Sequence, residues 1–215
     1  MVQQAVRPDR APAMEPERVT MTLGQYRDWQ TEERNRGEWV DGEVIVFVAP
    51  KTVHKRLSRF LTALIDGYAS DHDLGEVLQT PEMRLRDGGS YREPDIAFIA
   101  TAHAGRITAD GIDGPADLVI EIISEDSVRR DRKHKYDEYE ATGVREYWVI
   151  DPRPLLQTVY AYVLGDEGIF NPIGTNESSE IASVVLPGFW IDPAWLWRNP
   201  TPNVAETLRT IEAGR

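Results

Sequence analysis

The chain contains no cysteine among its 215 residues, and its four histidines lack the spacing of a zinc site. The missing cysteines exclude disulfides, cysteine-ligated zinc, iron–sulfur clusters and a thiol nucleophile, and they suit a reducing compartment, so we expect a cytoplasmic protein. No apolar run approaches the ~18 residues of a membrane span, and the N-terminus lacks the layout of a signal peptide. We therefore expect no membrane partner.

Three common catalytic motifs are also missing. The sequence has no Gly-x-Ser-x-Gly nucleophile elbow, no His-Glu-x-x-His zinc helix and no glycine-rich phosphate loop after a strand. Positive charge is scarce, because 24 Lys and Arg stand against 36 Asp and Glu, which gives a formal net charge of -12. As an average, this charge argues against a nucleic-acid partner, although a local basic face can still bind one.

The hydrophobic pattern predicts one α/β domain between two tails. Residues 1–18 carry three prolines and few large apolar side chains, so we expect a disordered N-terminal tail. The domain is expected over residues 19–198. Residues 199–215 contain Pro200 and Pro202 and are expected to form a weakly packed C-terminal tail.

Helices and strands alternate along the domain. Thr22, with Gln25 three residues later, predicts a capping box for a first helix, and Asp41-Gly42 between two β-prone runs predicts a hairpin. The strand–helix–strand pattern over 117–151 predicts parallel pairing, whereas the hairpins are antiparallel, so the sheet should be mixed. The remaining predicted elements are a helix at 53–70, two short strands within 75–86, a strand at 94–100, a helix at 127–142, later strands at 156–163, 168–174 and 181–186, and a helical turn at 193–197.

Glu121 interrupts the apolar run from Leu118 to Ile123 in a predicted strand. A buried carboxylate is unfavourable unless it is paired or bound to a metal. A structural interpretation is an edge strand, or a pair with a core arginine. Asp95 opens another predicted strand and, because it follows Pro94, could equally be a cap or turn residue. Together, two carboxylates near strand ends predict a site for a hard cation such as Mg²⁺.

Lys135 lies on the helix expected after Glu121. Asp131, Lys135 and Tyr139 are four residues apart and therefore share one helix face. A lysine near a scissile phosphate would orient the attacking water or stabilise the transition state. The run 129–135 contains five Lys or Arg and one acid. Its alternative interpretation is a solvated basic surface.

Further candidates lie upstream. His54 opens the helix predicted over 53–70, although a lone histidine is more often structural or exposed than catalytic. Glu38 and Glu43 flank the predicted hairpin, and either could join a metal site, but exposed hairpin carboxylates are common. Four basic residues surround His54: Lys51, Lys55, Arg56 and Arg59.

Four motifs follow one another along the chain: Arg92-Glu93-Pro94-Asp95-Ile96, Gly114 to Ser124, Asp131 to Lys135 followed by Tyr139, and Gly143 to Pro152. In this order they resemble the Uma-type family of restriction-endonuclease-like proteins, over about residues 20–190. The first helix, the hairpin from Glu38 to Glu43 and His54 also match. The family belongs to the PD-(D/E)XK nuclease-like superfamily, so the resemblance implies a restriction-endonuclease-like α/β core, with a mixed sheet flanked by helices and additional strands.

The resemblance also implies site residues. It assigns Asp95 and Glu121 to the two acidic positions, which would hold the metal. The lysine position two residues after Glu121 is Ile123, so the lysine would come from the following helix as Lys135, with Lys133 as the competitor. Supporting residues implied by the resemblance are Glu38, His54, Ser124 and Tyr139.

The leading hypothesis from the sequence is an endonuclease that uses Mg²⁺ or Mn²⁺ to hydrolyse phosphodiester bonds, with DNA as the substrate that the resemblance implies. One alternative is a nuclease-like fold that binds nucleic acid or protein without cleaving, and another is a phosphoesterase acting on a small substrate. Nothing in the sequence predicts base recognition. The expected phosphate contacts are Lys51, Lys55, Arg129, Arg130, Arg132 and Lys133.

A concentrated aromatic group lies near the end of the domain. We interpret it as core, but if exposed it would form the surface of a homodimer. Its members are Phe189, Trp190, Trp195 and Trp197.

Overall fold

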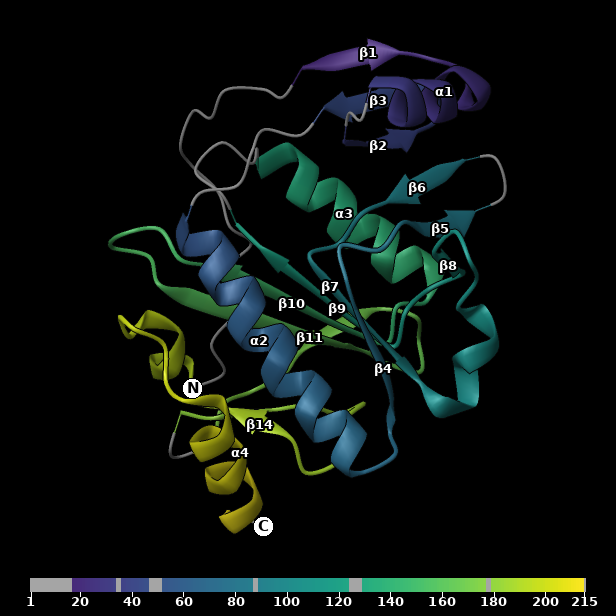
Figure 1. Cartoon of the computed structure of the whole chain (residues 1–215). Helices are drawn as coiled ribbons and strands as arrows, with labels where there is room; N and C mark the ends of the chain where they lie inside the picture. The colour runs from purple at the N-terminus through teal and green to yellow at the C-terminus, as the bar shows by residue number, and fades with distance from the viewer. Residues whose placement is uncertain are drawn as a thin grey trace.

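The computed structural model describes residues 17–33, 36–46, 52–86, 89–123, 129–176 and 179–214, with only the backbone for 31–33 and 129–132. Two six-stranded sheets and four α-helices form the main architecture of this part of the chain (Figure 1). A pair of two-residue strands, β13 (Ile181–Ala182) and β14 (Trp190–Ile191), forms a small third sheet. Among the described residues, no helix has both the length and the apolar character needed to span a membrane.

The central sheet is mixed, as the sequence predicts. Its strand order is β12-β11-β10-β9-β7-β4, and β9 and β10 are parallel while the other neighbours are antiparallel. The parallel pair is connected through a helix, which matches the predicted strand–helix–strand unit. The strands are β4 (Gly75–Gln79), β7 (Ile96–Ala100), β9 (Leu118–Ile122), β10 (Glu146–Asp151), β11 (Thr158–Leu164) and β12 (Phe170–Pro172).

Two helices cover opposite faces of this sheet. Helix α2 (Thr52–Asp71) packs its apolar side on the face that carries Ile120, and helix α3 (Arg129–Thr142) packs on the face that carries Val119. Successive side chains of a strand point to opposite faces. Glu121 therefore lies on the same face as Val119, toward α3.

The second sheet has the order β1-β3-β2-β6-β5-β8. Helix α1 (Leu23–Glu33) packs on it around Tyr26 and Trp39, and Figure 1 shows α3 between this sheet and the central one. Buried Met83 and Leu85 connect the second sheet to α3 and the central sheet in one core cluster. The strands are β1 (Arg18–Thr20), β2 (Gly37–Val40), β3 (Glu43–Val46), β5 (Met83–Arg86), β6 (Ser90–Arg92) and β8 (Ile112–Asp113).

Local sequence signals explain how these elements begin and turn. The backbone amide of Thr22 donates to Gln25 Oε1 (2.9 Å) and the amide of Gln25 donates to Thr22 Oγ1 (3.3 Å), so the predicted capping box is present. Asp41 and Gly42 have φ values of 49° and 90°, which a two-residue hairpin turn of type I′ requires. The predicted hairpin between β2 and β3 is thus confirmed.

The expectation of a weakly packed tail over 199–215 is wrong for the residues described. Helix α4 (Val204–Ala213) follows the two prolines, with Asn203 Oδ1 accepting from the backbone amide of Glu206 (3.1 Å) as its cap. Ile211 is fully buried, and Leu208 packs against the core near Gly67 of α2. The prolines precede the first turn of α4, where they do not interrupt a helix.

Two other expectations concern the ends of the domain. Arg18, the last residue of the expected N-terminal tail, belongs to β1 and pairs with Ile45 of β3, whereas residues 1–16 lie outside the described residues. Near the C-terminus, Phe189 and Trp195 are buried in the main core, and Trp190 and Trp197 pack against it. The aromatic group is therefore core, as interpreted, and does not form an exposed dimer surface. Two short 3₁₀ helices, η1 (Thr101–Arg106) and η2 (Pro193–Trp197), complete the described elements.

Candidate functional site

Asp95 and Glu121 lie at the same end of two neighbouring strands, since Asp95 immediately precedes β7 and Glu121 is the fourth residue of β9. Strand β7 pairs antiparallel with β9 so that Ile96 faces Ile120, and extending this register by one residue places Asp95 opposite Glu121. Opposite residues in an antiparallel pair point to the same face, with Cβ atoms roughly 5 Å apart. The backbone amide of Ile122 donates to Asp95 Oδ2 (2.7 Å) and fixes that carboxylate at the sheet edge. The two carboxylates therefore share one side of the sheet.

Glu121 is held from above by α3. Lys135 Nζ and the hydroxyl of Tyr139 both donate to Glu121 Oε1, and each donor–acceptor distance is 2.9 Å. One turn of helix separates these donors, so the spacing noted in the sequence places both over the strand. Burial raises the pKa of Glu121 to about 7, because desolvation and the nearby Asp95 and Glu38 outweigh the opposing effect of Lys135.

Glu38 reaches the same lysine from the second sheet. Its Oε1 lies 2.7 Å from Lys135 Nζ, and its side chain is 2% exposed. Burial disfavours the charged form of Lys135, but Glu121 and Glu38 outweigh burial and raise its pKa. Lys135 is thus an ammonium group held between carboxylates from two different sheets.

Two further residues of this network escaped the sequence analysis. Arg92, 3% exposed, donates from Nη1 to Glu38 Oε2 (3.0 Å) and from Nε to Glu138 Oε2 (2.7 Å). Arg92 lies three residues before Asp95 in the same motif, and this closeness in sequence could have marked it as a site residue. Glu138 lies three residues after Lys135 on α3, but nothing local distinguishes it from a solvated helix residue. Their pairing depends on contact between β6 and α3, which the sequence does not reveal.

His54 approaches Asp95 from the first turn of α2. Its Nε2 lies 3.0 Å from Asp95 Oδ1, so both oxygens of this carboxylate have a partner. His54 Nδ1 is buried and has no hydrogen-bond partner among the described residues. The histidine can therefore orient Asp95 through Nε2, while Nδ1 makes no hydrogen bond to the described residues.

The carboxylates of this site are candidate ligands for a divalent cation. Those of Glu38, Asp95, Glu121 and Glu138 lie around the cations Lys135 and Arg92, and Arg86 also reaches Glu138 (3.4 Å). Carboxylate oxygens at a sheet edge suit Mg²⁺ or Mn²⁺. Asp95 and Glu121 alone supply few ligands, and the described residues contain no group of three or more His, Asp or Glu side chains that could hold a metal. Water and backbone oxygen would have to complete the coordination.

The other predicted site residues do not join this network in the described part of the chain. Lys55 and Lys133 are exposed, and Lys133 projects from a different side of α3 than Lys135. Glu43, a candidate ligand in the sequence, instead pairs with Arg18 (3.0 Å). Lys51, Ser124 and the side chains of Arg129, Arg130, Asp131 and Arg132 lie outside the described residues.

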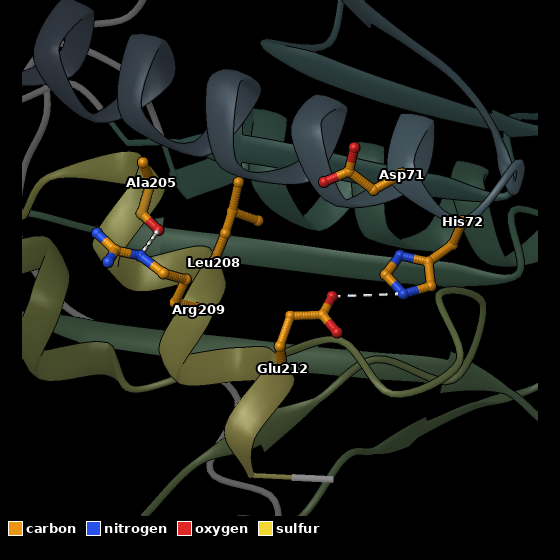
Figure 2. Close-up of a pocket in the computed structure, with 6 residues that line it drawn as sticks. All are labelled: Asp71, His72, Ala205, Leu208, Arg209 and Glu212. Carbon is orange, nitrogen blue, oxygen red and sulfur yellow. Dashed lines mark hydrogen bonds and ion pairs between the residues drawn. The ribbon is translucent and has the colours of Figure 1, made fainter.

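A pocket elsewhere in the molecule has a different character. Figure 2 shows it between the end of α2 and α4, where His72 Nε2 lies 3.3 Å from Glu212 Oε1. His72 is 18 residues beyond His54, a separation of about 27 Å along a helix. The pocket is therefore separate from the Asp95–Glu121 site. Its lining is Asp71, His72, Ala205, Leu208, Arg209 and Glu212.

Comparison with known proteins agrees with this architecture. A putative nuclease of the DUF820 group from Anabaena variabilis, known from its crystal structure, matches with a TM-score of 0.65 and 18% sequence identity, covering 82% of this chain and 97% of that protein. At this identity the match shows the fold, which is restriction-endonuclease-like as expected. No curated protein matches the sequence. The Uma2 family, described as "Putative restriction endonuclease", matches residues 23–194. With its motifs, mixed sheet and fold agreeing over that range, the chain belongs to the Uma2 family.

Proposed function

We propose that the protein is a metal-dependent endonuclease that hydrolyses phosphodiester bonds, with DNA as its substrate. The observation that carries this proposal is the position of Asp95, which immediately precedes β7, beside Glu121 of β9: Asp95 Oδ2 accepts from the backbone amide of Ile122 (2.7 Å), and Lys135 Nζ lies 2.9 Å from Glu121 Oε1. Family membership supports the nuclease class. The assignment of a metal rests on the carboxylates of the site, and that of DNA as substrate rests on the family resemblance.

Asp95 and Glu121 would hold Mg²⁺ or Mn²⁺ at the edge of the central sheet. Such an ion, when bound, polarises the phosphate and lowers the pKa of coordinated water. His54 would keep Asp95 oriented through Oδ1, while the Ile122 amide fixes Oδ2. The nearness of the two carboxylates, which raises the pKa of Glu121 while no metal is bound, supports the assignment.

Lys135 would act as a fixed cation. Because its pKa is raised, the amine stays protonated at neutral pH and cannot serve as a general base. It would instead orient the attacking water or offset negative charge in the transition state. Glu38 and Tyr139 would hold this arrangement in place. Exposure of Lys133 supports Lys135 as the catalytic lysine of the two.

Contact with DNA would come from basic residues near the site. Exposed Lys55 lies next to His54 on α2, and Lys133 lies on α3. Such contacts are to phosphates and therefore independent of sequence and sensitive to salt. The predicted contacts Lys51, Arg129, Arg130 and Arg132 belong to the same proposal.

One observation favours a second candidate, a nuclease-like module that binds without cleaving. Lys135 is bound by two carboxylates, and buried Ile123 stands at the usual lysine position. If neither carboxylate releases the amine, phosphate cannot engage it. The plasmid-nicking experiment described next separates this binding function from cleavage.

The test is nicking of supercoiled plasmid with Mg²⁺, with Mn²⁺ or with EDTA. We expect metal-dependent nicking by the native protein, and its loss in Asp95→Asn, Glu121→Gln and Lys135→Met, which remove charge with little change in size. Lys133→Met is the comparison for Lys135→Met: it removes one phosphate contact and should retain metal-dependent nicking at low salt. Persistent cleavage by Glu121→Gln would contradict the site. DNA binding without cleavage in every metal would instead support the binding module.

A further inference from the structure

The turn between β10 and β11 exposes two adjacent leucines. Leu155 is 103% exposed and Leu156 is 50% exposed, next to Pro154. Hairpin turns are usually built from glycine, asparagine, aspartate and serine. Two solvated leucines at such a tip therefore need an explanation beyond the turn itself.

The tip is held firmly by hydrogen bonds at its base. Arg153 donates to the carboxylate of Asp151 from Nε (2.9 Å), from Nη2 (2.7 Å) and from its backbone amide (3.2 Å). The amides of Leu156 and Gln157 donate to the carbonyl of Arg153 over 3.0 and 3.2 Å. The chain is thus fixed on both sides of the exposed leucines.

The backbone of the tip is unusual as well. Leu155 has φ 73° and Gln157 has φ 38°, so two residues with side chains occupy the left-handed region that favours glycine. Strained backbone that the surrounding structure maintains is typical of functional segments. Here the strain accompanies the exposure of Leu155 to solvent.

The tip and the candidate site lie at the same end of the central sheet, where the parallel strands β9 and β10 both end. Glu121 on β9 is in parallel register with Val149 on β10, and Leu155 follows Val149 by six residues. Six residues span at most about 20 Å. That length corresponds to roughly six base pairs of duplex DNA, at 3.4 Å per step. A duplex bound at Glu121 can therefore reach the leucine tip.

The charge of the tip also permits contact with an anionic duplex. The chain has a net charge of -12, yet residues 152–157 contain no acid and one cation, Arg153. The adjacent Asp151 is 3% exposed and is paired with Arg153. Repulsion of phosphates is thus absent from this segment of an otherwise acidic protein.

We infer that Leu155 and Leu156 form an apolar wedge that inserts between stacked base pairs of a DNA duplex. Leucine is among the side chains that proteins insert between base steps, where they partly unstack and kink the duplex. The kink would expose the scissile strand to Asp95 and Glu121. This inference rests on the proposed function, because the partner is identified by the position of the tip beside the nuclease site.

The test uses a variant with both Leu155→Ser and Leu156→Ser. Ile169→Ser is the matched control, because Ile169 is 54% exposed and lies in the β11–β12 turn at the opposite edge of the same sheet. All three side chains are solvated, so the variants should fold, which thermal unfolding checks. The substrates are a continuous DNA duplex with 2-aminopurine at successive positions, and the same sequence with a short unpaired stretch.

We expect 2-aminopurine fluorescence to rise when the native protein or Ile169→Ser binds the continuous duplex. The double variant should lose most of this rise. Its kcat/KM on the continuous duplex should fall at least tenfold, while its kcat/KM on the unpaired substrate should stay within twofold of the native value.

Equal fluorescence and equal rates in native and double-variant protein would overturn the wedge and leave the nuclease proposal intact. Absence of cleavage by the native protein would count against the nuclease, whereas the fluorescence signal needs only binding and still decides the wedge. The wedge would also be overturned if the double variant kept the native 2-aminopurine signal but lost self-association in light scattering, or lost binding to phospholipid vesicles. The tip would then contact a second copy or a lipid surface.

Discussion

Lys135 on α3 donates to Glu121 on β9 over 2.9 Å, although the two residues are 14 positions apart in the sequence. The strand position where the superfamily pattern places a lysine is instead Ile123, which is buried in the core beneath α3. In the proposed mechanism only the position of the ammonium group matters, and α3 would supply it. Lys135 also belongs to a buried ionic network, in which the loss of one partner leaves another charge without its compensation.

Arg92 should contribute strongly to stability. Arg92→Ala removes a buried cation that pairs with both Glu38 and Glu138, and breaking a buried pair costs about 3–5 kcal/mol. For a domain of this size we expect Tm to fall by roughly 6–20 °C. Thermal unfolding followed by circular dichroism measures it. Arg86→Ala is the control, since Arg86 is about half exposed and also contacts Glu138, and its loss should lower Tm little. Equal effects of the two substitutions would contradict the network.

Glu121 should make the metal-free protein more stable in acid. Its pKa in the folded state is about 7, above the ordinary value of 4.5, so the folded protein binds a proton that the unfolded chain releases. This contribution is fully present below about pH 4.5 and is lost as the pH rises through about 7. The free energy of unfolding of native protein, relative to Glu121→Gln, should therefore decrease between pH 4.5 and 7. Urea titrations with EDTA measure it, and a flat difference would show that Glu121 has an ordinary pKa.

Metal binding should show the opposite dependence on pH. Because a ligand carboxylate must be ionised, Mn²⁺ affinity should fall by up to about tenfold for each pH unit below 7. Isothermal titration calorimetry between pH 6 and 8 measures this affinity. Glu121→Gln should bind weakly at every pH, and strong binding by this variant would place the metal elsewhere.

Lys55 and Lys133 should contribute to DNA affinity through phosphate contacts. Each contact releases counterions, so Lys55→Ala or Lys133→Ala should reduce the slope of log affinity against log salt by about 0.9. Fluorescence anisotropy with a short duplex at several NaCl concentrations measures the slope. Arg209→Ala, on α4 beside the separate pocket, should leave it unchanged. A slope that neither lysine alters would remove both from the interface.

Glu146 should be important for folding and not for the reaction. It is completely buried and accepts hydrogen bonds from Trp148 Nε1, Ser183 Oγ and the amides of Val184 and Val185, at 2.7–3.0 Å. Glu146→Ala leaves these donors unsatisfied, at a cost of about 1–3 kcal/mol for each one that water cannot reach. We expect a Tm lower by more than 5 °C with nicking preserved at low temperature. Loss of nicking by a folded variant would contradict this separation.

The sequence predicts best those features that depend on neighbours along the chain. The capping box at Thr22, the Asp41-Gly42 turn and the parallel pair around α3 are set by local spacing, and all three are present. Glu121 was identifiable because a carboxylate interrupts an apolar strand. Arg92 and Glu138 were missed because their pairing joins separate elements. Pro200 and Pro202 predict the end of regular structure, whereas Asn203 caps a further helix, α4, directly after them.

The candidate site is assembled from both sheets and two helices, with Glu38 near the beginning of the chain and Tyr139 101 residues later. During synthesis, no partial chain that ends before α3 contains the ammonium group of Lys135. A chain that lacks β2 has no Glu38 to hold that group. If the chain is the endonuclease proposed above, a nascent chain would gain the complete site only after α3 has been synthesised and has packed against both sheets.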